Sequence, residues 1–355
     1  MRVALVGPIQ SGKSTLFAAA AEAGGSSVHV SRPNVPHLAV IKVPDERLPW
    51  LAEQYNLKKV VYAELELLDV PGLDLTDQAG RSHAQTHWPV MRQSDMLVFV
   101  VRGFGDESVP AYRGRVDPAS DVGELLAELI FADLDQVTAR IEKLTAAVKK
   151  PTAKRSEQQH ELELMQRIAE ALENGQSVSD VVASESEAKL IRSFAFLSRM
   201  PVLVVVNCSE DQLTAQGEQV MNLPTLWLSA QIEEEIARLA PVERQAFLSD
   251  LGVEASAADR LIRACYEQLD LVSFLTVGDE ECRAWTVVAG TDAVTAAGEV
   301  HSDMSRGFIR AETVNYDDLR AAGDMKAARA AGKVRLEGKH YIVQDGDVIN
   351  FRFNV

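Results

Sequence analysis

The stretch Gly7-Pro8-Ile9-Gln10-Ser11-Gly12-Lys13-Ser14 decides the fold of this chain, because a glycine is followed by four residues and then by Gly-Lys-Ser. Glycines let backbone N–H groups curl around phosphates, the lysine reaches the terminal phosphates, and the serine hydroxyl is a ligand for Mg²⁺. The run Arg2–Val6 predicts a strand that enters the loop, and Thr15–Ala23 predicts a helix that leaves it with its positive end at the anion. The residues expected to bind the phosphates are Gly7, Gln10, Ser11, Gly12, Lys13, Ser14 and Thr15.

A second motif, Asp69-Val70-Pro71-Gly72, follows the apolar run Leu65–Leu68. An Asp at the end of a strand, downstream of a phosphate loop, suits a water-mediated contact with Mg²⁺, so Ser14 and Asp69 are the expected metal-binding residues. Gly72 can offer its N–H to a γ-phosphate and couple that phosphate to the segment behind it. Asp-x-x-Gly alone carries little information, but its position here makes it a candidate switch.

A third motif, Asn207-Cys208-Ser209-Glu210, follows the run Val202–Val206. GTPases place Asn-Lys-x-Asp at this point, where the Asp accepts hydrogen bonds from two guanine donors. Adenine offers a carboxylate in this position only its 6-amino group, so the shorter Asp favours guanine. The longer Glu210 and the missing lysine therefore argue against strict guanine selection. Cys208 is either an oxidation-sensitive group or a small apolar replacement for the lysine, and the usual behaviour of free cysteine favours the second. The expected base-binding residues are Asn207, Glu210, Ser229 and Ala230.

Short, nearly continuous apolar runs recur along the first 230 residues, which predicts a parallel sheet covered on both faces. Between Asp69 and Asn207 the pattern changes to apolar residues spaced three and four apart, which predicts two helices separated by Lys149-Lys150-Pro151. The helical positions are Leu134, Val137, Ile141, Leu144, Val148, Leu162, Met165, Ala169 and Leu172. We therefore expect an inserted antiparallel hairpin with a basic tip, and the sequence leaves open whether it extends the core or binds a partner.

After Leu269 the runs Arg283–Val288, His340–Val343 and Val348–Phe353 alternate with glycine turns, which predicts a small α+β domain. The predicted division of the chain has three parts. They are a nucleotide-binding domain over 1–122 and 196–272, the helical hairpin over 123–195 and the last domain over 273–355.

Composition excludes several classes of protein. The chain has 355 residues, with 36 Lys and Arg against 52 Asp and Glu, and its net charge of −16 argues against coating DNA or an anionic membrane. Its 46% hydrophobic content supports a folded core, and three separate cysteines argue against a disulfide framework. Since no apolar run could span a membrane or serve as a secretory signal, we expect a cytoplasmic protein, and a monomer, without DNA or membrane partners.

Together these motifs resemble the YchF/Obg-like ATPase family, a branch of the translation-factor class of P-loop NTPases. The resemblance covers effectively the whole chain and includes Phe131-Ala132-Asp133-Leu134-Asp135 and Leu261-Ile262-Arg263-Ala264-Cys265-Tyr266. It is most specific near the end, where Arg283-Ala284-Trp285-Thr286, residues 307–312 and residues 337–347 are similar to the family's TGS domain. The resemblance implies an α/β fold: a doubly wound P-loop NTPase sheet, an inserted α-helical (coiled-coil) hairpin and a C-terminal ubiquitin-like β-grasp (TGS) domain. It also implies hydrolysis of ATP and often GTP, a need for Mg²⁺, and association with the ribosome or ribosomal RNA.

The departures from the family pattern concern hydrolysis more than binding. Gln10 stands where the family usually has Asn, which bears on a monovalent-cation role. Leu73 follows Gly72, so a water-orienting Gln is absent, and Ser31 is a poor substitute for the Thr expected in the first switch. A family histidine is replaced by Ala111.

The leading hypothesis is a slow Mg²⁺-dependent ATPase, possibly also a GTPase, that acts as a ribosome-associated regulatory switch, with Lys13 as the catalytic residue. The alternative is a nucleotide-sensing module that binds the ribosome or RNA with little or no hydrolysis. A metabolite kinase is a third reading, which the base motif and the TGS-like tail disfavour.

Two further features have competing interpretations. His83 and His87 are four residues apart, a spacing that can ligate zinc, but solvated switch-region residues are the favoured interpretation. A basic stretch in the last domain either contacts RNA phosphates or is a solvated surface. Its residues are Lys326, Arg329, Lys333, Arg335 and Lys339.

Overall fold

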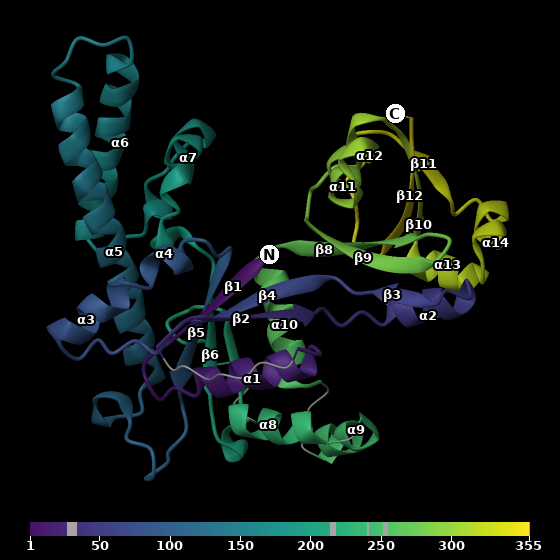
Figure 1. Cartoon of the computed structure of the whole chain (residues 1–355), viewed down its shortest axis with the longest axis horizontal. Helices are drawn as coiled ribbons and strands as arrows, with labels where there is room; N and C mark the ends of the chain where they lie inside the picture. The colour runs from purple at the N-terminus through teal and green to yellow at the C-terminus, as the bar shows by residue number, and fades with distance from the viewer. Residues whose placement is uncertain (27–33, 214–217, 240, 251–254, 355) are drawn as a thin grey trace. The chain divides into compact units, whose positions relative to one another are not determined.

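The chain is organised around two six-stranded sheets (Figure 1). The computed structural model describes residues 1–26, 34–213, 218–239, 241–250 and 255–354. It separates into two compact units, of which the first comprises Met1–Ala39 and Glu66–Ala258 and the second comprises Val40–Leu65 and Asp259–Val355. The second unit is therefore assembled from two stretches that lie far apart in the sequence.

The first sheet carries all three nucleotide motifs. Its strand order is β2 (His37–Lys42), β4 (Glu64–Asp69), β1 (Arg2–Val6), β5 (Met96–Arg102), β6 (Val202–Asn207) and β7 (Thr225–Leu228). β1 pairs in parallel with both β4 and β5, and β5, β6 and β7 continue in parallel. Every residue of β5 is buried, as expected for a central strand covered on both faces. The predicted doubly wound α/β sheet is confirmed.

Helices cover both faces of this sheet. On one face α1 (Lys13–Ala23) contacts β1 and packs on α8 (Ala230–Arg238). On the other face the start of α5 (Pro118–Ala147) joins a core with strand residues such as Phe99. The remaining helices of this unit are α3 (Gln78–Gln85), α4 (Trp88–Met91) and α9 (Pro241–Asp250), whereas α10 (Ala257–Gln268) lies almost entirely in the second unit.

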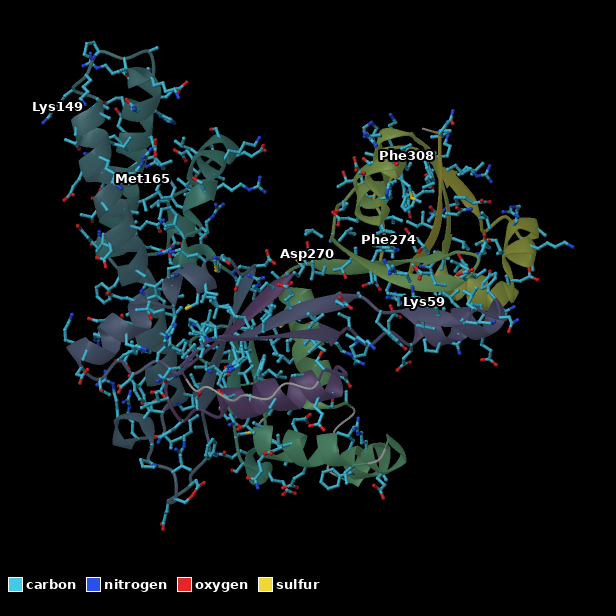
Figure 2. The ribbon with its side chains drawn as sticks, viewed as in Figure 1. Lys59, Lys149, Met165, Asp270, Phe274 and Phe308 are labelled. Carbon is cyan, nitrogen blue, oxygen red and sulfur yellow. The ribbon has the colours of Figure 1, made fainter. Side chains whose placement is uncertain are left out.

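The predicted helical hairpin is formed by α5 and α6 (Arg155–Glu173), with the short helix α7 (Glu185–Ile191) after it. Its apolar seam includes Val137, Leu144 and Met165, which are almost completely buried. Lys149 lies at the tip between the two helices (Figure 2). α5 begins before the predicted boundary at 123, because Asp117 caps it by accepting from the backbone N–H of Ser120. The residues of α5 up to Ala132 contribute to the core of the first sheet, and the rest of the helix forms the arm with α6.

The second sheet belongs to the second unit. Its order is β11 (Arg335–Glu337), β10 (Phe308–Asn315), β12 (Asp347–Phe353), β8 (Leu271–Val277), β9 (Glu281–Val288) and β3 (Lys59–Val61). One face packs on α11 (Ala293–Val300), around a core that includes Phe274 and Phe308 (Figure 2). The other helices of this unit are α2 (Arg47–Gln54), α12 (Ser302–Arg306), α13 (Tyr316–Ala322) and α14 (Met325–Ala330).

Two features of the second unit differ from expectation. The predicted strand His340–Val343 is wrong, since only Ile342 forms an isolated bridge, to Asp292. The backbone there is used instead to hold the start of α11, because the N–H of Ala293 donates to the carbonyl of Tyr341. The edge strand β3 was not expected at all, and it pairs in parallel with β9, with an ion pair from Lys59 to Glu281 at 2.5 Å.

The proposed three-part division of the chain stays a prediction. The two units of the structure place the hairpin together with the first sheet, and they place 259–272 with the C-terminal residues. Among the helices that the structure describes, none is long and apolar enough to cross a membrane.

Candidate nucleotide site

The phosphate loop connects β1 to α1, and its shape depends on two glycines. Gly12 caps α1 in the left-handed region, with φ of 83°, and a Cβ there would lie 2.0 Å from Asn207 Nδ2. A Cβ on Gly7 would lie 2.1 Å from the carbonyl oxygen of Val100. Gln10 also has a positive φ of 63°, a conformation that Asn adopts more readily than Gln. The loop, here called the glycine cradle, therefore packs so closely against β5 and Asn207 that a side chain at position 7 or 12 would collide with them.

Three predicted residues meet at the base of this loop. Lys13 Nζ donates to Asp69 Oδ1, and Ser14 Oγ donates to Asp69 Oδ2 at 2.9 Å. Lys13 is only 4% exposed, and burial, opposed in part by the attraction of Asp69, lowers the pKa of its ammonium group. The lysine that would neutralise a phosphate and the two expected metal-binding residues thus lie together, although they come from distant parts of the chain.

Gly72 lies directly against the phosphate loop. A Cβ on Gly72 would be 3.1 Å from Ile9 Cα, so the two backbones touch. The next residue is bonded to the loop on both sides, because Leu73 N–H donates to the Gly7 carbonyl at 2.9 Å and Ile9 N–H donates to the Leu73 carbonyl at 3.1 Å. The segment after the Asp-x-x-Gly motif is consequently attached to the loop itself.

Asn207 links the loop to the base motif. Its Nδ2 donates to the Ser11 carbonyl at 3.0 Å, and its Oδ1 accepts from the Ala230 N–H at 2.9 Å. The side chain is 5% exposed, so both hydrogen bonds are shielded from water. Ser229 begins α8 by accepting from Ile232 N–H at 3.4 Å. We predicted Asn207 as a base-binding residue, and the structure shows that its side chain bridges two loops.

A cavity of about 670 Å³ opens beside these residues. It contains the expected Gln10, Thr15 and Glu210 and brings Phe104 to the same wall. Further lining residues that sequence reasoning missed are Asp106, Val109, Gln231 and Glu235. Their position just after β5 and β7 could have indicated them, since ligands of parallel sheets bind at the carboxyl ends of strands.

The structure bears on Cys208 and on the two histidines, for which the sequence allows two interpretations each. Cys208 is buried, and its Sγ donates to the Leu228 carbonyl at 3.3 Å, a location that suits a small apolar residue. His83 is exposed, but His87 is only 6% exposed, so the expectation of two solvated histidines is wrong for His87. The two rings meet edge to face at 5.1 Å. Ser31 lies outside the described residues.

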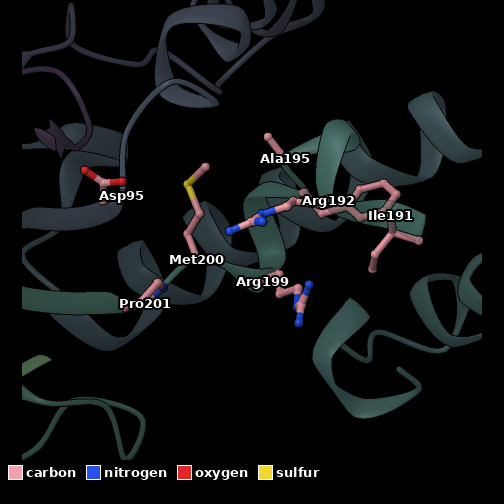
Figure 3. A pocket seen from close by; sticks show the side chains of 8 residues that line it. Asp95, Ile191, Arg192, Ala195, Arg199, Met200 and Pro201 are labelled. Carbon is pink, nitrogen blue, oxygen red and sulfur yellow. The ribbon is translucent and has the colours of Figure 1, made fainter. Parts of the chain in front are cut away.

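A smaller hollow of about 370 Å³ lies at the opposite edge of the sheet, where Asp95 and Pro201 precede β5 and β6 (Figure 3). Figure 3 shows Arg192 and Arg199 reaching it from the segment after α7. Because it lies at the amino ends of the strands, this hollow is separate from the phosphate loop.

The parallel sheet, the glycine cradle and the Lys13–Asp69–Ser14 cluster define the fold as that of a P-loop NTPase. A family model named YchF-GTPase_C, described as "Protein of unknown function (DUF933)", matches residues 271–354. A relative named "Ribosome-binding ATPase YchF", from Bacillus subtilis (strain 168), is 40% identical over 99% of this chain and 98% of its own length.

Two more distant proteins match over equally long stretches. One named "Obg-like ATPase 1", from Oryza sativa subsp. japonica, is 31% identical over 100% of this chain and 92% of its own length. The solved structure of the Schizosaccharomyces pombe YchF GTPase superposes with a TM-score of 0.82, at 28% identity, over 99% of this chain and 97% of that one. The chain therefore belongs to the YchF family.

Proposed function

We propose that this chain binds ATP, and to a lesser extent GTP, hydrolyses it slowly and acts as a ribosome-associated regulatory switch. The observation that carries the proposal is the convergence of Lys13 and Ser14 on Asp69 beneath the glycine cradle. Relatives of full length are named ribosome-binding ATPases, which supports both the nucleotide and the partner.

The site suits a nucleoside triphosphate with Mg²⁺. Ser11 Oγ is buried within the loop and has no hydrogen-bond partner among the described residues, so it is free to meet a phosphate oxygen. Ser14 and Asp69 offer a hydroxyl and a carboxylate, the oxygen donors that Mg²⁺ accepts alongside phosphates and water. When bound, Mg²⁺ would neutralise charge on the β- and γ-phosphates. No cluster of three or more acidic, His or Cys ligands occurs in the described part of the chain, consistent with a metal held partly by the substrate.

The reaction is transfer of the γ-phosphoryl group to water. Water attacks the γ-phosphorus, the bond to the β,γ-bridging oxygen breaks, and ADP, phosphate and a proton are released. Lys13 stabilises the charge on the departing and transferred groups once its bond to Asp69 is exchanged for the phosphates. Leu73 supplies no polar atom from its side chain to orient the water, which predicts slow turnover by the protein alone.

The decisive experiment is competition between ATP and GTP for the full-length chain, with and without Mg²⁺. We expect ATP to bind more tightly than GTP in the wild type and Glu210→Asp to shift the ratio toward GTP, because the shorter carboxylate suits the two guanine donors. A strong wild-type preference for GTP would contradict the proposed role of Glu210. A matched control is Glu218→Asp, since Glu218 is exposed and does not line the cavity.

The second candidate function is nucleotide sensing without hydrolysis, and Leu73 is the observation that favours it. Single-turnover hydrolysis with and without ribosomes separates the two functions. Product formation supports the ATPase, whereas bound ATP that stays intact in both conditions supports the sensor.

We propose the hairpin tip as one contact with ribosomal RNA. Lys149 and Lys150 are exposed on a chain with a net charge of −16, so they form a local exception to its acidity. Reversing both charges should weaken co-sedimentation with ribosomes, whereas Lys58→Glu, at another exposed lysine, should not.

We also propose that residues 273–355 form a TGS domain, that the chain is a monomer and that it works in the cytoplasm. Equilibrium sedimentation tests the monomer.

A further inference from the structure

The backbone of Leu75 is held by two side chains outside the phosphate loop. Leu75 N–H donates to Tyr112 Oη at 3.3 Å, and Arg113 Nη2 donates to the Leu75 carbonyl at 2.8 Å. Leu75 is 1% exposed and Tyr112 is 4% exposed, so water competes little for the bond between them, whereas the Arg113 side chain is 31% exposed and its bond is partly shielded. Both polar groups of one backbone residue are thus satisfied by neighbouring side chains rather than by a strand.

Glu124 on α5 anchors both of these side chains. Tyr112 Oη donates to Glu124 Oε2 at 3.0 Å, Arg113 Nε donates to the same oxygen at 3.1 Å, and Arg113 Nη2 also reaches Glu124 Oε1. Burial disfavours the charged form of Glu124, but the bonds from Arg113 and Tyr112 outweigh it and lower the pKa of the carboxyl group. Burial, and then the bond to Glu124, raises the pKa of Tyr112 to about 12, so its hydroxyl remains a donor.

The turn that presents these side chains is strained. Arg113 has φ of 51°, in the left-handed region that costs a non-glycine residue about 1 kcal/mol or more. A glycine would adopt this conformation at no cost, but it would lose the guanidinium that bridges Leu75 and Glu124. The strained backbone of Arg113 therefore accompanies the contacts that its guanidinium makes with Leu75 and Glu124.

Further along the same segment, α3 is tied to α5 as well. Arg81 on α3 is paired with Glu128, and its Nη2 lies 3.8 Å from Glu124 Oε1. Glu128 is 6% exposed, and burial, offset in part by Arg81, raises the pKa of its carboxyl group. Figure 1 shows α3 beside the part of α5 nearest the sheet.

These contacts form one continuous connection. Leu73 is bonded to the phosphate loop, Leu75 is bonded to Tyr112 and Arg113, and these two are bonded to Glu124. The segment that runs behind a γ-phosphate is therefore held between the loop and α5. Leu73 has no polar side chain, so only the backbone of this segment can contact the reacting groups. The placement of that backbone matters, because displacement of reacting groups by about 1 Å can slow a reaction about a hundredfold.

We propose that Tyr112 and Arg113, anchored on Glu124, are positioning residues for the hydrolysis of ATP: they fix the Gly72–Leu75 backbone against the phosphate loop. The inference rests on the proposed ATPase function. The two residues bind no substrate themselves, and they act through the backbone of Leu75.

The test is single-turnover hydrolysis by the full-length chain, with ATP affinity measured separately by titration. Tyr112→Phe removes one oxygen and keeps the ring, so we expect the hydrolysis rate to fall about tenfold while the Kd for ATP changes by less than about twofold. Glu124→Gln keeps an acceptor for Tyr112 and should retain more activity than Glu124→Ala. The matched control is Glu161→Gln, which removes an α5–α6 ion pair with Arg140 far from Leu75 and should hydrolyse like the wild type.

Three outcomes would overturn the inference. Hydrolysis by Tyr112→Phe at the wild-type rate would show that the Leu75 contact does not matter. An increase in Kd that matches the loss of rate would show that the contact assembles the binding site rather than placing the reacting groups. Wild type that binds ATP but forms no product would overturn the proposed ATPase as well, which distinguishes that failure from the first two.

Discussion

Asn207→Ala tests the hydrogen bonds that join the phosphate loop to the base pocket. The substitution leaves two shielded backbone groups without their partner, namely the Ser11 carbonyl, now 3.0 Å from Nδ2, and the Ala230 N–H, now 2.9 Å from Oδ1. Each buried group left unpaired costs about 1–3 kcal/mol, so we expect the free energy of unfolding to fall by about 2–6 kcal/mol for the two groups. The loop should also bind ATP at least about tenfold more weakly, since 1.4 kcal/mol corresponds to tenfold.

Urea unfolding followed by circular dichroism measures the stability, and titration with ATP measures the affinity. Asn174→Ala is the matched control, because Asn174 Nδ2 also donates to a backbone carbonyl, that of Glu170 at 2.8 Å, but is exposed. The control should change the free energy of unfolding by less than about 0.5 kcal/mol. If Asn207→Ala costs no more than Asn174→Ala, or if ATP binds as before, Asn207 does not hold the two loops together.

Three more predictions follow from other polar groups. Asp69→Asn should abolish most of the increase in ATP affinity that Mg²⁺ produces, measured by calorimetry with and without the metal; an undiminished Mg²⁺ effect would remove Asp69 from the metal site. Asp133→Ala should destabilise the chain by about 3–5 kcal/mol in urea unfolding, because fully buried Asp133 accepts from Arg92, Leu197 N–H and Ser198 N–H; a loss below about 1 kcal/mol would contradict this. Burial, against the opposing charge of Arg115, raises the pKa of Asp121 to about 6, so the folded state holds the extra proton and stability should fall as the pH rises from about 4 to about 6. Asp121→Asn should remove this part of the pH dependence, and an unchanged difference between the two proteins across that range would refute the shift.

The positioning contacts change how the hairpin is understood. The helix that leads to the basic tip, α5, carries Glu124 and Glu128 near its other end. The arm therefore begins at the segment that follows Gly72, rather than at an inert part of the sheet. A partner that displaced α5 would act directly on Tyr112, Arg113 and Arg81, because all three side chains are bonded to Glu124 or Glu128.

The strands and helices that flank the three motifs lie where the local patterns predict them, whereas the binding roles of the motif residues stay predictions. The phosphate loop needs glycines at fixed positions and a lysine and serine at its end, so consecutive residues are enough to predict it. The same holds for the hairpin, since residues three and four apart share a helix face whatever surrounds them. Asp69 and Asn207 could be placed because strand ends in a parallel sheet share one edge. The role of Asn207 as a bridge, however, depended on knowing that Ser11 and Ala230 lie on either side of it.

Two predictions, for His340–Val343 and for His87, were wrong because contacts with distant residues outweighed the local pattern. His340–Val343 has the composition of a strand, but its backbone bonds to Thr291 and Ala293 instead of to a neighbouring strand. His87 looked like a polar surface residue, yet the fold buries it beside the apolar core of the first sheet.

The sequence by itself determined the P-loop class, the inserted hairpin and the acidic character of the chain, because each follows from residue type and short-range spacing. Only the tertiary structure decided that Val40–Leu65 belongs with the C-terminal residues, and that Leu75 is held by Tyr112 and Arg113. In both cases the partners are far apart along the chain. Burial and hydrogen bonding between such residues depend on how the chain folds back on itself. The spacing of residues along the sequence does not predict these distant contacts.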